Sequence, residues 1–215
     1  MPKLLSALFL FATLVVPATH ASRNPASKGF RATAGRHSNA MLAAVKLMPV
    51  DKYGYTPTRD GQRDFDFELG TWTIDMKRLQ HPLSGSTTWT HPEGYTHIVQ
   101  KVWGGQASLA QLANDRPSLH FDGLMLRMYD PGSHEWRIYW GSSRTGTLDE
   151  PMIGHFTNGR GEFVMHDTYE GKPILARVVY SDITPTSFRT ESSFSADNGA
   201  SWEPNLVQAF ARMTK

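Results

Sequence analysis

The chain contains no cysteine among its 215 residues. This absence excludes a disulfide framework, a zinc site built on thiolates and a thiol nucleophile. Also missing are the Gly-x-Ser-x-Gly elbow of serine hydrolases, the His-Glu-x-x-His helix of zinc peptidases, the phosphate-binding loop and the dinucleotide fingerprint. These absences weaken the common hydrolase, metalloprotease and nucleotide-enzyme interpretations, and no metal site is predicted.

An excess of charge of one sign is also lacking. The chain has 22 basic and 20 acidic residues, a formal net charge of +2, and the two signs are interspersed. Proteins that bind nucleic acid or an anionic membrane usually gather basic side chains on one face. We therefore expect no nucleic-acid partner, while the composition leaves the oligomeric state open.

The long apolar run at the N-terminus spans residues 4–16, follows a basic start at Lys3 and precedes small residues up to Ala21. This three-part pattern is typical of a secretory signal peptide. The run is shorter than the roughly 20 residues that a membrane-spanning helix needs. We predict a signal peptide over residues 1–21 and an exported protein, periplasmic or secreted, without a stable membrane span. A buried N-terminal helix or an uncleaved anchor is the alternative.

Residues 22–62 are rich in small and polar residues and have few apolar clusters. We interpret this segment as a linker or an arm on the following domain, and Ser38-Asn39 would cap a short helix at 39–47. A poorly structured segment is the alternative, because such a composition buries little apolar surface.

Residues 63–215 change to a two-residue hydrophobic period and form the predicted barrel domain. Strands are predicted at 68–79, 87–91, 95–103, 120–129, 135–141, 152–156, 162–168, 174–183, 187–194 and 202–212. Turn residues such as Asn158-Gly159 separate them, and residues 108–114 are predicted to form a helical turn. The fold class is all-β: a single antiparallel up-and-down β-barrel of about ten strands, since closure removes both exposed edges. A β-sandwich is the alternative.

Several blocks in this domain occur in a characteristic order. They are Asp64-Phe65-Asp66-Phe67 with Gly70-Thr71-Trp72, Phe121-Asp122-Gly123, Trp136-Arg137-Ile138-Tyr139-Trp140, Tyr169-Glu170-Gly171 and Asp197 with Gly199 and Trp202-Glu203. In this order, over residues 62–213, the chain resembles the lipocalin-like proteins grouped as the domain of unknown function DUF1579. The resemblance implies a calycin-type barrel with a ligand cavity and no particular reaction. Tyr180, Ser192-Ser193 and Leu206 depart from the residues expected in that family.

Candidate ligand-binding residues are aromatic and polar side chains of the predicted strands. They are Trp89, Arg127, Trp136, Trp140, His155, Arg177, Arg189 and Glu191. Trp136 and Trp140 share one strand face, which we predict to be the inner face because burying two indoles removes much apolar surface from water. Both rings are either the wall of a pocket or ordinary core.

Arg177, Arg189 and Glu191 are the candidate catalytic residues. Arg189 and Glu191 share one face of their strand, and inside a barrel such a pair could bind a carboxylate or polarise a carbonyl. On the outer face they would form a surface ion pair of little energetic value. An arginine often packs over the tryptophan of the Gly-x-Trp step in such barrels, and Arg212 or Arg189 could do so over Trp72.

No cofactor is expected, although haem is a weaker alternative. A neutral imidazole inside the cavity can ligate haem iron, and His155 would be the residue. Three functional hypotheses remain at this stage. The first, which we favour, is a non-enzymatic exported barrel that binds a small apolar or amphipathic ligand. The second is an isomerase, cyclase or hydrolase that uses Arg and Glu inside the barrel. The third is an envelope interaction protein whose barrel is filled with side chains.

Overall fold

A computed structural model describes residues 59–114 and 122–214. The predicted signal peptide, the helix at 39–47 and most of the predicted arm lie outside these residues. Within them, the chain forms two short 3-10 helices, η1 (Asp66–Glu68) and η2 (Trp103–Gly105), and eleven strands. The strands are β1 (Gly70–Leu79), β2 (Trp89–Thr90), β3 (Tyr95–Val102), β4 (Ala107–Asn114), β5 (Gly123–Asp130), β6 (Glu135–Ser142), β7 (Met152–Thr157), β8 (Arg160–Tyr169), β9 (Lys172–Ser181), β10 (Ser187–Ser195) and β11 (Glu203–Arg212).

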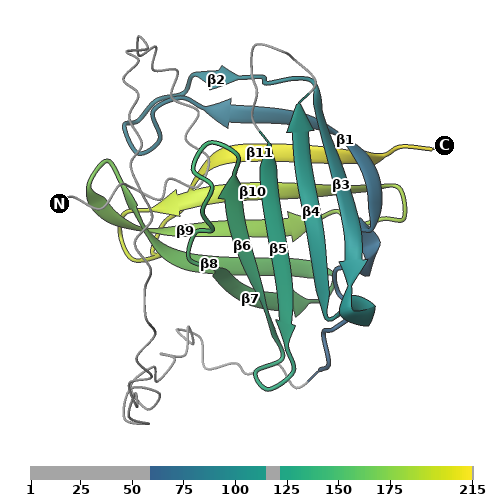
Figure 1. Ribbon diagram of the computed structural model, residues 1–215. Coiled ribbons are helices and arrows are strands. Elements are labelled where there is room, and N and C mark those ends of the chain that lie inside the picture. The colour runs from purple at the N-terminus through teal and green to yellow at the C-terminus, as the bar shows by residue number, and fades with distance from the viewer. Residues whose placement is uncertain (1–58, 115–121, 215) are drawn as a thin grey trace, which may run out of the picture. The chain divides into compact units, whose positions relative to one another are not determined.

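The strands form a closed antiparallel barrel, as the sequence predicts (Figure 1). From β3 to β11 each strand pairs with the next, and β1 pairs with both β3 and β11. The closing pair runs from Trp72 opposite Arg212 to Arg78 opposite Leu206. The short β2 pairs only with the end of β1 and is not part of the closed ring. Closure satisfies the backbone hydrogen bonds of both end strands and leaves no long open edge.

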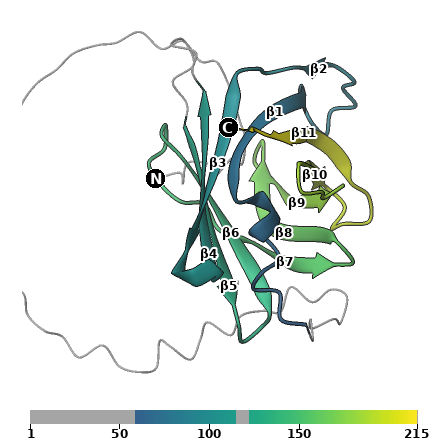
Figure 2. The same cartoon turned by 90° about the vertical axis from the view of Figure 1, so that its right-hand side faces the viewer.

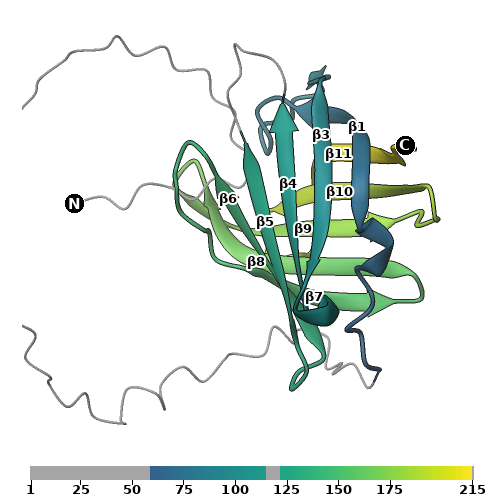
Figure 3. The same ribbon diagram turned by 45° about the vertical axis from the view of Figure 1, so that its right-hand side comes forward.

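The barrel has two groups of strands that cross at a steep angle. In Figure 1, β3 to β6 run across the directions of β8 to β11, and Figure 3 shows the same crossing from a second side. In Figure 2, η1 lies beside the start of β1. This arrangement encloses the side chains that alternate inward along every strand.

Side-chain alternation identifies the inner face. On β1, Trp72, Ile74 and Met76 are buried, whereas Thr73 and Asp75 are exposed. Residues opposite each other in neighbouring antiparallel strands point to the same face, so the register assigns the inner residues of each strand in turn. A two-residue hydrophobic period therefore predicts both the strands and their inner faces.

The prediction of a helical turn at 108–114 is wrong. These residues belong to β4, which pairs with β3 from Ala107 to Asn114 and with β5 from Ala107 to Leu112. The segment Ala-Ser-Leu-Ala-Gln-Leu-Ala-Asn contains good helix formers, and local propensity favours a helix there. The backbone hydrogen bonds that this segment makes to β3 and β5 outweigh that weak preference.

One end of the barrel is closed by aromatic side chains. Phe65, only 2% exposed, precedes η1 and contacts the rings of Trp136, Phe156 and Phe163. At the same end, the Arg212 guanidinium stacks 4.1 Å from the centre of the Trp72 ring. The prediction that Arg212 or Arg189 packs over this tryptophan is therefore confirmed, with Arg212 as the residue. The described part of the chain contains no helix with the length and apolarity needed to span a membrane.

Candidate functional site

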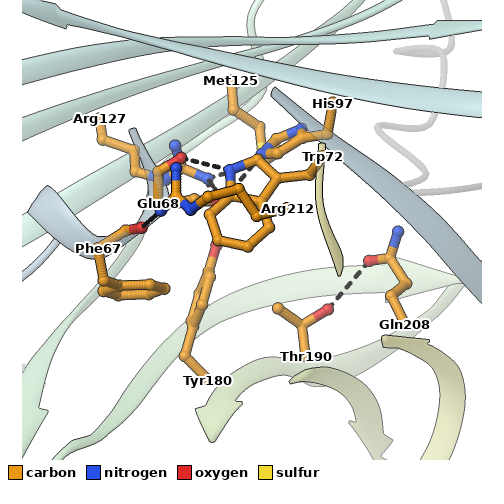
Figure 4. Close-up of polar contacts among 10 residues, drawn as sticks. All are labelled: Phe67, Glu68, Trp72, His97, Met125, Arg127, Tyr180, Thr190, Gln208 and Arg212. Carbon is orange, nitrogen blue, oxygen red and sulfur yellow. Dashed lines mark hydrogen bonds and ion pairs between the residues drawn. The ribbon is translucent and has the colours of Figure 1, made fainter. Parts of the chain in front are cut away.

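Four polar side chains meet inside the barrel near this closed end. Glu68 is the last residue of η1, and His97, Arg127 and Tyr180 project inward from β3, β5 and β9. We call these four residues the floor cluster. The close-up in Figure 4 shows how side chains from distant parts of the sequence converge on the Glu68 carboxylate.

Glu68 Oε1 is the centre of the floor cluster. His97 Nε2 lies 2.8 Å and Arg127 Nη2 2.9 Å from this oxygen (Figure 4). The same Nη2 atom lies 3.4 Å from the Tyr180 hydroxyl, and the Arg127 guanidinium lies 4.8 Å from the centre of the Phe65 ring. The backbone also holds Glu68 in place, because Trp72 Nε1 donates a 2.7 Å hydrogen bond to its carbonyl oxygen.

The charges of the floor cluster are buried. Glu68 and His97 are 1% exposed, and Arg127 is fully buried. Burial alone would raise the pKa of the Glu68 carboxyl, but the Arg127 charge and the His97 hydrogen bond outweigh it and lower this pKa below its usual value. Glu68 is therefore a carboxylate, which only accepts hydrogen bonds, so the proton in its contact with His97 sits on Nε2.

Arg127 and Tyr180 keep their usual protonation states, because the pKa of each is raised. Burial would lower the pKa of the Arg127 guanidinium, but Glu68 and Tyr180 raise it above its ordinary value. Burial raises the pKa of the Tyr180 phenol to about 12, against the opposing effect of Arg127. Arg127 is a cation and Tyr180 a neutral phenol at any physiological pH.

The floor cluster has more hydrogen-bonding groups than its own members satisfy. Among the described residues, no hydrogen-bond partner exists for Arg127 Nε and Nη1, His97 Nδ1 or Glu68 Oε2. Ser108, opposite Arg127 on β4, is also buried and its hydroxyl has no partner among these residues. Unpaired polar atoms at such depth are costly, so this part of the barrel is suited to a further polar group.

The barrel wall beyond the floor cluster is mainly apolar. Met125 and Val178 face inward, as their register with Trp140 and Phe163 shows, yet both are only half-buried. Each of these two side chains therefore keeps some accessible surface on the inner face. Met125 Sδ lies 3.8 Å from Arg127 Nη2, so this accessible part of the wall adjoins the floor cluster.

A second polar pair lies on the inner face of the wall formed by β10 and β11. The Thr190 hydroxyl donates a 3.1 Å hydrogen bond to Gln208 Oε1 (Figure 4). Thr190 is opposite Tyr180 in the register of β10 and β9, which places the pair next to the floor cluster. It carries no charge, so its chemistry is limited to hydrogen bonding.

Three predicted ligand-binding residues face the interior: Arg127, Trp136 and Trp140. Trp136 belongs to the closed end, where its Nε1 donates a 2.9 Å hydrogen bond to the Gly61 carbonyl oxygen. Trp140 covers Gly123, at which a Cβ atom would clash with the indole ring. Among these three residues, Arg127 alone joins the floor cluster.

The other predicted residues do not lie with the floor cluster. His155, Arg177, Arg189 and Glu191 are on the outer face, because the residues on either side of them point inward. Arg189 pairs with Glu191 at 2.7 Å as a partly exposed surface ion pair, which was the outward alternative. Arg177 stacks 4.1 Å from the Trp202 ring and lies 3.5 Å from Glu162.

Trp89 lies on β2, outside the closed ring, with Lys77 Nζ 5.0 Å from its ring centre. The haem alternative required an inward imidazole from His155, and the structure places this side chain on the outer face. Within residues 59–114 and 122–214, no group of three or more metal-ligating side chains is assembled. An open hollow of about 260 Å3 lies over the outer face of β5 and β6 and is lined by Met128, Arg137 and Tyr139.

Sequence reasoning missed Glu68, His97 and Tyr180 as members of a site. Alternation could have identified His97, because it lies between the apolar inner residues Tyr95 and Val99. Glu68 gives no such signal, because its position depends on η1 turning into the end of the barrel. Tyr180 was noted only as a departure from the family pattern.

Neither a scan against models of known protein families nor a search of curated proteins found a match to this chain. The resemblance to the DUF1579 family therefore remains a prediction from the residue blocks of the sequence. What the structure establishes is a closed antiparallel β-barrel, consistent with a lipocalin-like fold, with a buried polar floor cluster inside it.

Proposed function

We propose that this protein is an exported lipocalin-like barrel that binds a small amphipathic molecule inside, with its polar end on the floor cluster. The observation that carries the proposal is the Arg127 guanidinium, which is fully buried and has two nitrogens without a partner among the described residues. Buried arginines normally use their hydrogen-bond donors. A ligand that accepts a hydrogen bond from Nη1 would satisfy a buried donor that is otherwise energetically costly.

The apolar character of the ligand follows from the rest of the wall. Met125 and Val178 keep accessible surface on the inner face, and large apolar side chains lie beside them, Trp140 opposite Met125 and Phe163 opposite Val178. Binding sites for small molecules are typically apolar with a few well-placed polar groups, which is the arrangement of this interior. This partial exposure supports ligand binding over the alternative of a completely filled barrel.

An enzyme is the second candidate, and one observation favours it. The Glu68 carboxylate holds His97 through Nε2, which leaves Nδ1 as an acceptor with no partner among the described residues. A carboxylate that orients an imidazole in this way is a common arrangement for a general base. Arg127 could then stabilise negative charge on a carbonyl substrate. Because its pKa is lowered, Glu68 itself is suited to orienting His97 and not to donating a proton.

The test is to identify small molecules that copurify with the exported protein, by mass spectrometry after denaturation. The same measurement is made on the double variant Glu68→Gln/Arg127→Met and on the surface variant Arg189→Gln. The double variant removes both buried charges together, so it avoids leaving one of them uncompensated. Arg189→Gln is the matched control, because Arg189 is an arginine on the outer face.

We expect an amphipathic compound with the wild-type protein and with Arg189→Gln, and its loss from the double variant. A compound retained equally by all three proteins would contradict a role for the floor cluster. If no compound copurifies and a fluorescent amphipathic probe fails to bind the empty barrel, the proposed function is wrong. Turnover of the copurifying compound that stops in His97→Gln would establish the enzymatic candidate instead.

A further inference from the structure

The floor cluster is electrically neutral when His97 is neutral. Its fixed charges are the Glu68 carboxylate and the Arg127 guanidinium, whose nearest atoms are 2.9 Å apart. Tyr180 adds a hydroxyl and no charge. The Arg127 charge is therefore already balanced before any ligand arrives.

The groups around His97 come from several elements. Glu68 of η1 faces its Nε2, and Trp72 and Leu112 are its neighbours in the register of β1 and β4. The Phe210 ring of β11 lies 5.4 Å from the imidazole centre. Of the titratable groups, Glu68 contacts His97 directly, and Arg127 and Tyr180 lie beyond that carboxylate. Tyr95 lies two residues before His97 on the same inner face of β3. Arg212 is held away at the closed end by the Leu69 and Phe67 carbonyl oxygens.

A bare anion is a poor ligand for a neutral cluster in a buried site. It would introduce a negative charge that no unpaired cation of the floor cluster offsets, and burying an uncompensated charge is strongly unfavourable. The unused hydrogen-bonding atoms instead include donors on Arg127 Nη1 and an acceptor at His97 Nδ1. A carboxylic acid group offers the complementary set, a carbonyl oxygen that accepts and a hydroxyl that donates.

We propose that the polar end of the ligand is a carboxylic acid that binds together with one proton, held between the ligand and His97 Nδ1. This inference rests on the proposed function. The balance is one carboxylate and one proton from water, which give either a neutral acid beside neutral His97 or a carboxylate beside an imidazolium. Both descriptions contain the same atoms and charge, and only an O–H or N–H bond forms.

Proton uptake predicts a pH dependence of binding. A carboxylic acid with a pKa of about 4 to 5 is ionised in neutral water, so the bound proton must come from solution. Each proton taken up changes the dissociation constant about tenfold per pH unit. Affinity for a fatty acid should therefore fall about 100-fold between about pH 7 and about pH 9.

The experiment is isothermal titration calorimetry of the full exported chain with dodecanoate and with dodecanol. Titrations in two buffers of different ionisation enthalpy count the protons taken up. We expect about one proton for each dodecanoate bound and none for dodecanol, whose affinity should not change with pH.

Two variants separate the role of charge balance from a general effect on the barrel. Glu68→Gln gives the cluster a net positive charge, so dodecanoate should bind it as an anion without proton uptake and without the pH dependence. Glu191→Gln changes a carboxylate of the outer face and should behave like the wild type. If Glu68→Gln does not fold, the wild-type proton counts decide the question alone.

Dodecanoate binding without proton uptake would overturn this inference and leave the proposed function intact. Binding of dodecanol but not of dodecanoate would do the same. If neither probe binds and no amphipathic compound copurifies, both the inference and the proposed function fail. One proton with dodecanoate, none with dodecanol and none with dodecanoate in Glu68→Gln would establish the inference.

Discussion

At the scale of single residues, Arg127 is the member of the floor cluster that contacts both Glu68 and Tyr180. It is fully buried, and its Nη2 contacts both Glu68 Oε1 and the Tyr180 hydroxyl. The sequence predicted Arg127 as a ligand-binding residue without its partners. Its carboxylate partner lies 59 positions away along the chain, which residue spacing alone does not reveal.

Replacing Arg127 alone should strongly destabilise the protein. Arg127→Met leaves the buried Glu68 carboxylate without its cation, and breaking such a pair costs about 3–5 kcal/mol. The double variant Glu68→Gln/Arg127→Met should recover much of that loss, because it removes both charges. Urea unfolding of the two variants measures the difference. Equal stability of the single and double variants would show that the carboxylate does not depend on Arg127.

Tyr180 should contribute stability that is lost in alkaline solution. Burial raises its pKa from 10.0 to about 12 in the folded state, so the unfolded chain ionises first. The contribution is fully present below about pH 10 and disappears as the pH rises through about 12. A difference of about two pKa units corresponds to about 3 kcal/mol.

The measurement is the free energy of unfolding at about pH 9 and at about pH 11, for the wild type and Tyr180→Phe. The wild type should lose more stability between these pH values than the variant, because only the wild type must keep this phenol neutral. Tyr139→Phe is the control, since this tyrosine lies on the outer face by the hollow above β5 and β6. An identical alkaline loss in Tyr180→Phe would contradict the assignment.

At the scale of elements, η1 and the residue before it close the barrel and deliver Glu68. Phe65 is 2% exposed and packs among the rings of the closed end, whereas Phe67 in the same segment is only half-buried. The sequence predicted a strand from residue 68 and no helical segment before it. Period-two alternation identifies strands but carries no information on a short helix at the barrel end.

The two phenylalanines provide a matched comparison. Phe65→Ala should cost about 3–5 kcal/mol, because the cavity lies among fixed aromatic rings that cannot collapse into it. Phe67→Ala removes the same atoms from a more exposed position and should cost clearly less. Unfolding in guanidinium chloride measures both values. If Phe67→Ala is as damaging as Phe65→Ala, the closed end does not depend on Phe65 in the way described.

At the scale of the whole molecule, the pairing of β1 with β11 closes the barrel and so determines which side chains it encloses. Arg212, near the end of β11, donates 2.7 Å hydrogen bonds to the carbonyl oxygens of Pro185, Leu69 and Phe67. It also stacks over Trp72 of β1. One side chain therefore connects the last strand to the first strand and to η1.

Arg212→Lys should weaken this closure. A lysine keeps the charge but lacks the planar fork that reaches three carbonyl oxygens, so we expect a loss of about 2 kcal/mol. Hydrogen exchange of the β1 and β11 amides should accelerate at the same time, since closure pairs these two strands. Arg189→Lys, on the outer face, is the control and should change stability by less than about 0.5 kcal/mol. Unchanged exchange in Arg212→Lys would show that Arg212 is not required for closure.

The sequence by itself determined the all-β class, the antiparallel order and most strand positions, because a two-residue period and the turn residues are local properties of the chain. It also predicted that Trp136 and Trp140 face inward, because burying two indole rings removes more apolar surface from water than burying the opposite face of the strand. It did not determine β4, whose helix-forming residues are held as a strand by β3 and β5.

Only the tertiary structure decided which polar residues form the site. Glu191 and Arg189 share one strand face in the sequence pattern, but the direction of that face depends on the register with neighbouring strands. Glu68, His97 and Tyr180 come from three separate elements, and only barrel closure brings them to Arg127. Alternation along one strand is set by local geometry, whereas contacts between distant strands are set by how the sheet curls and closes.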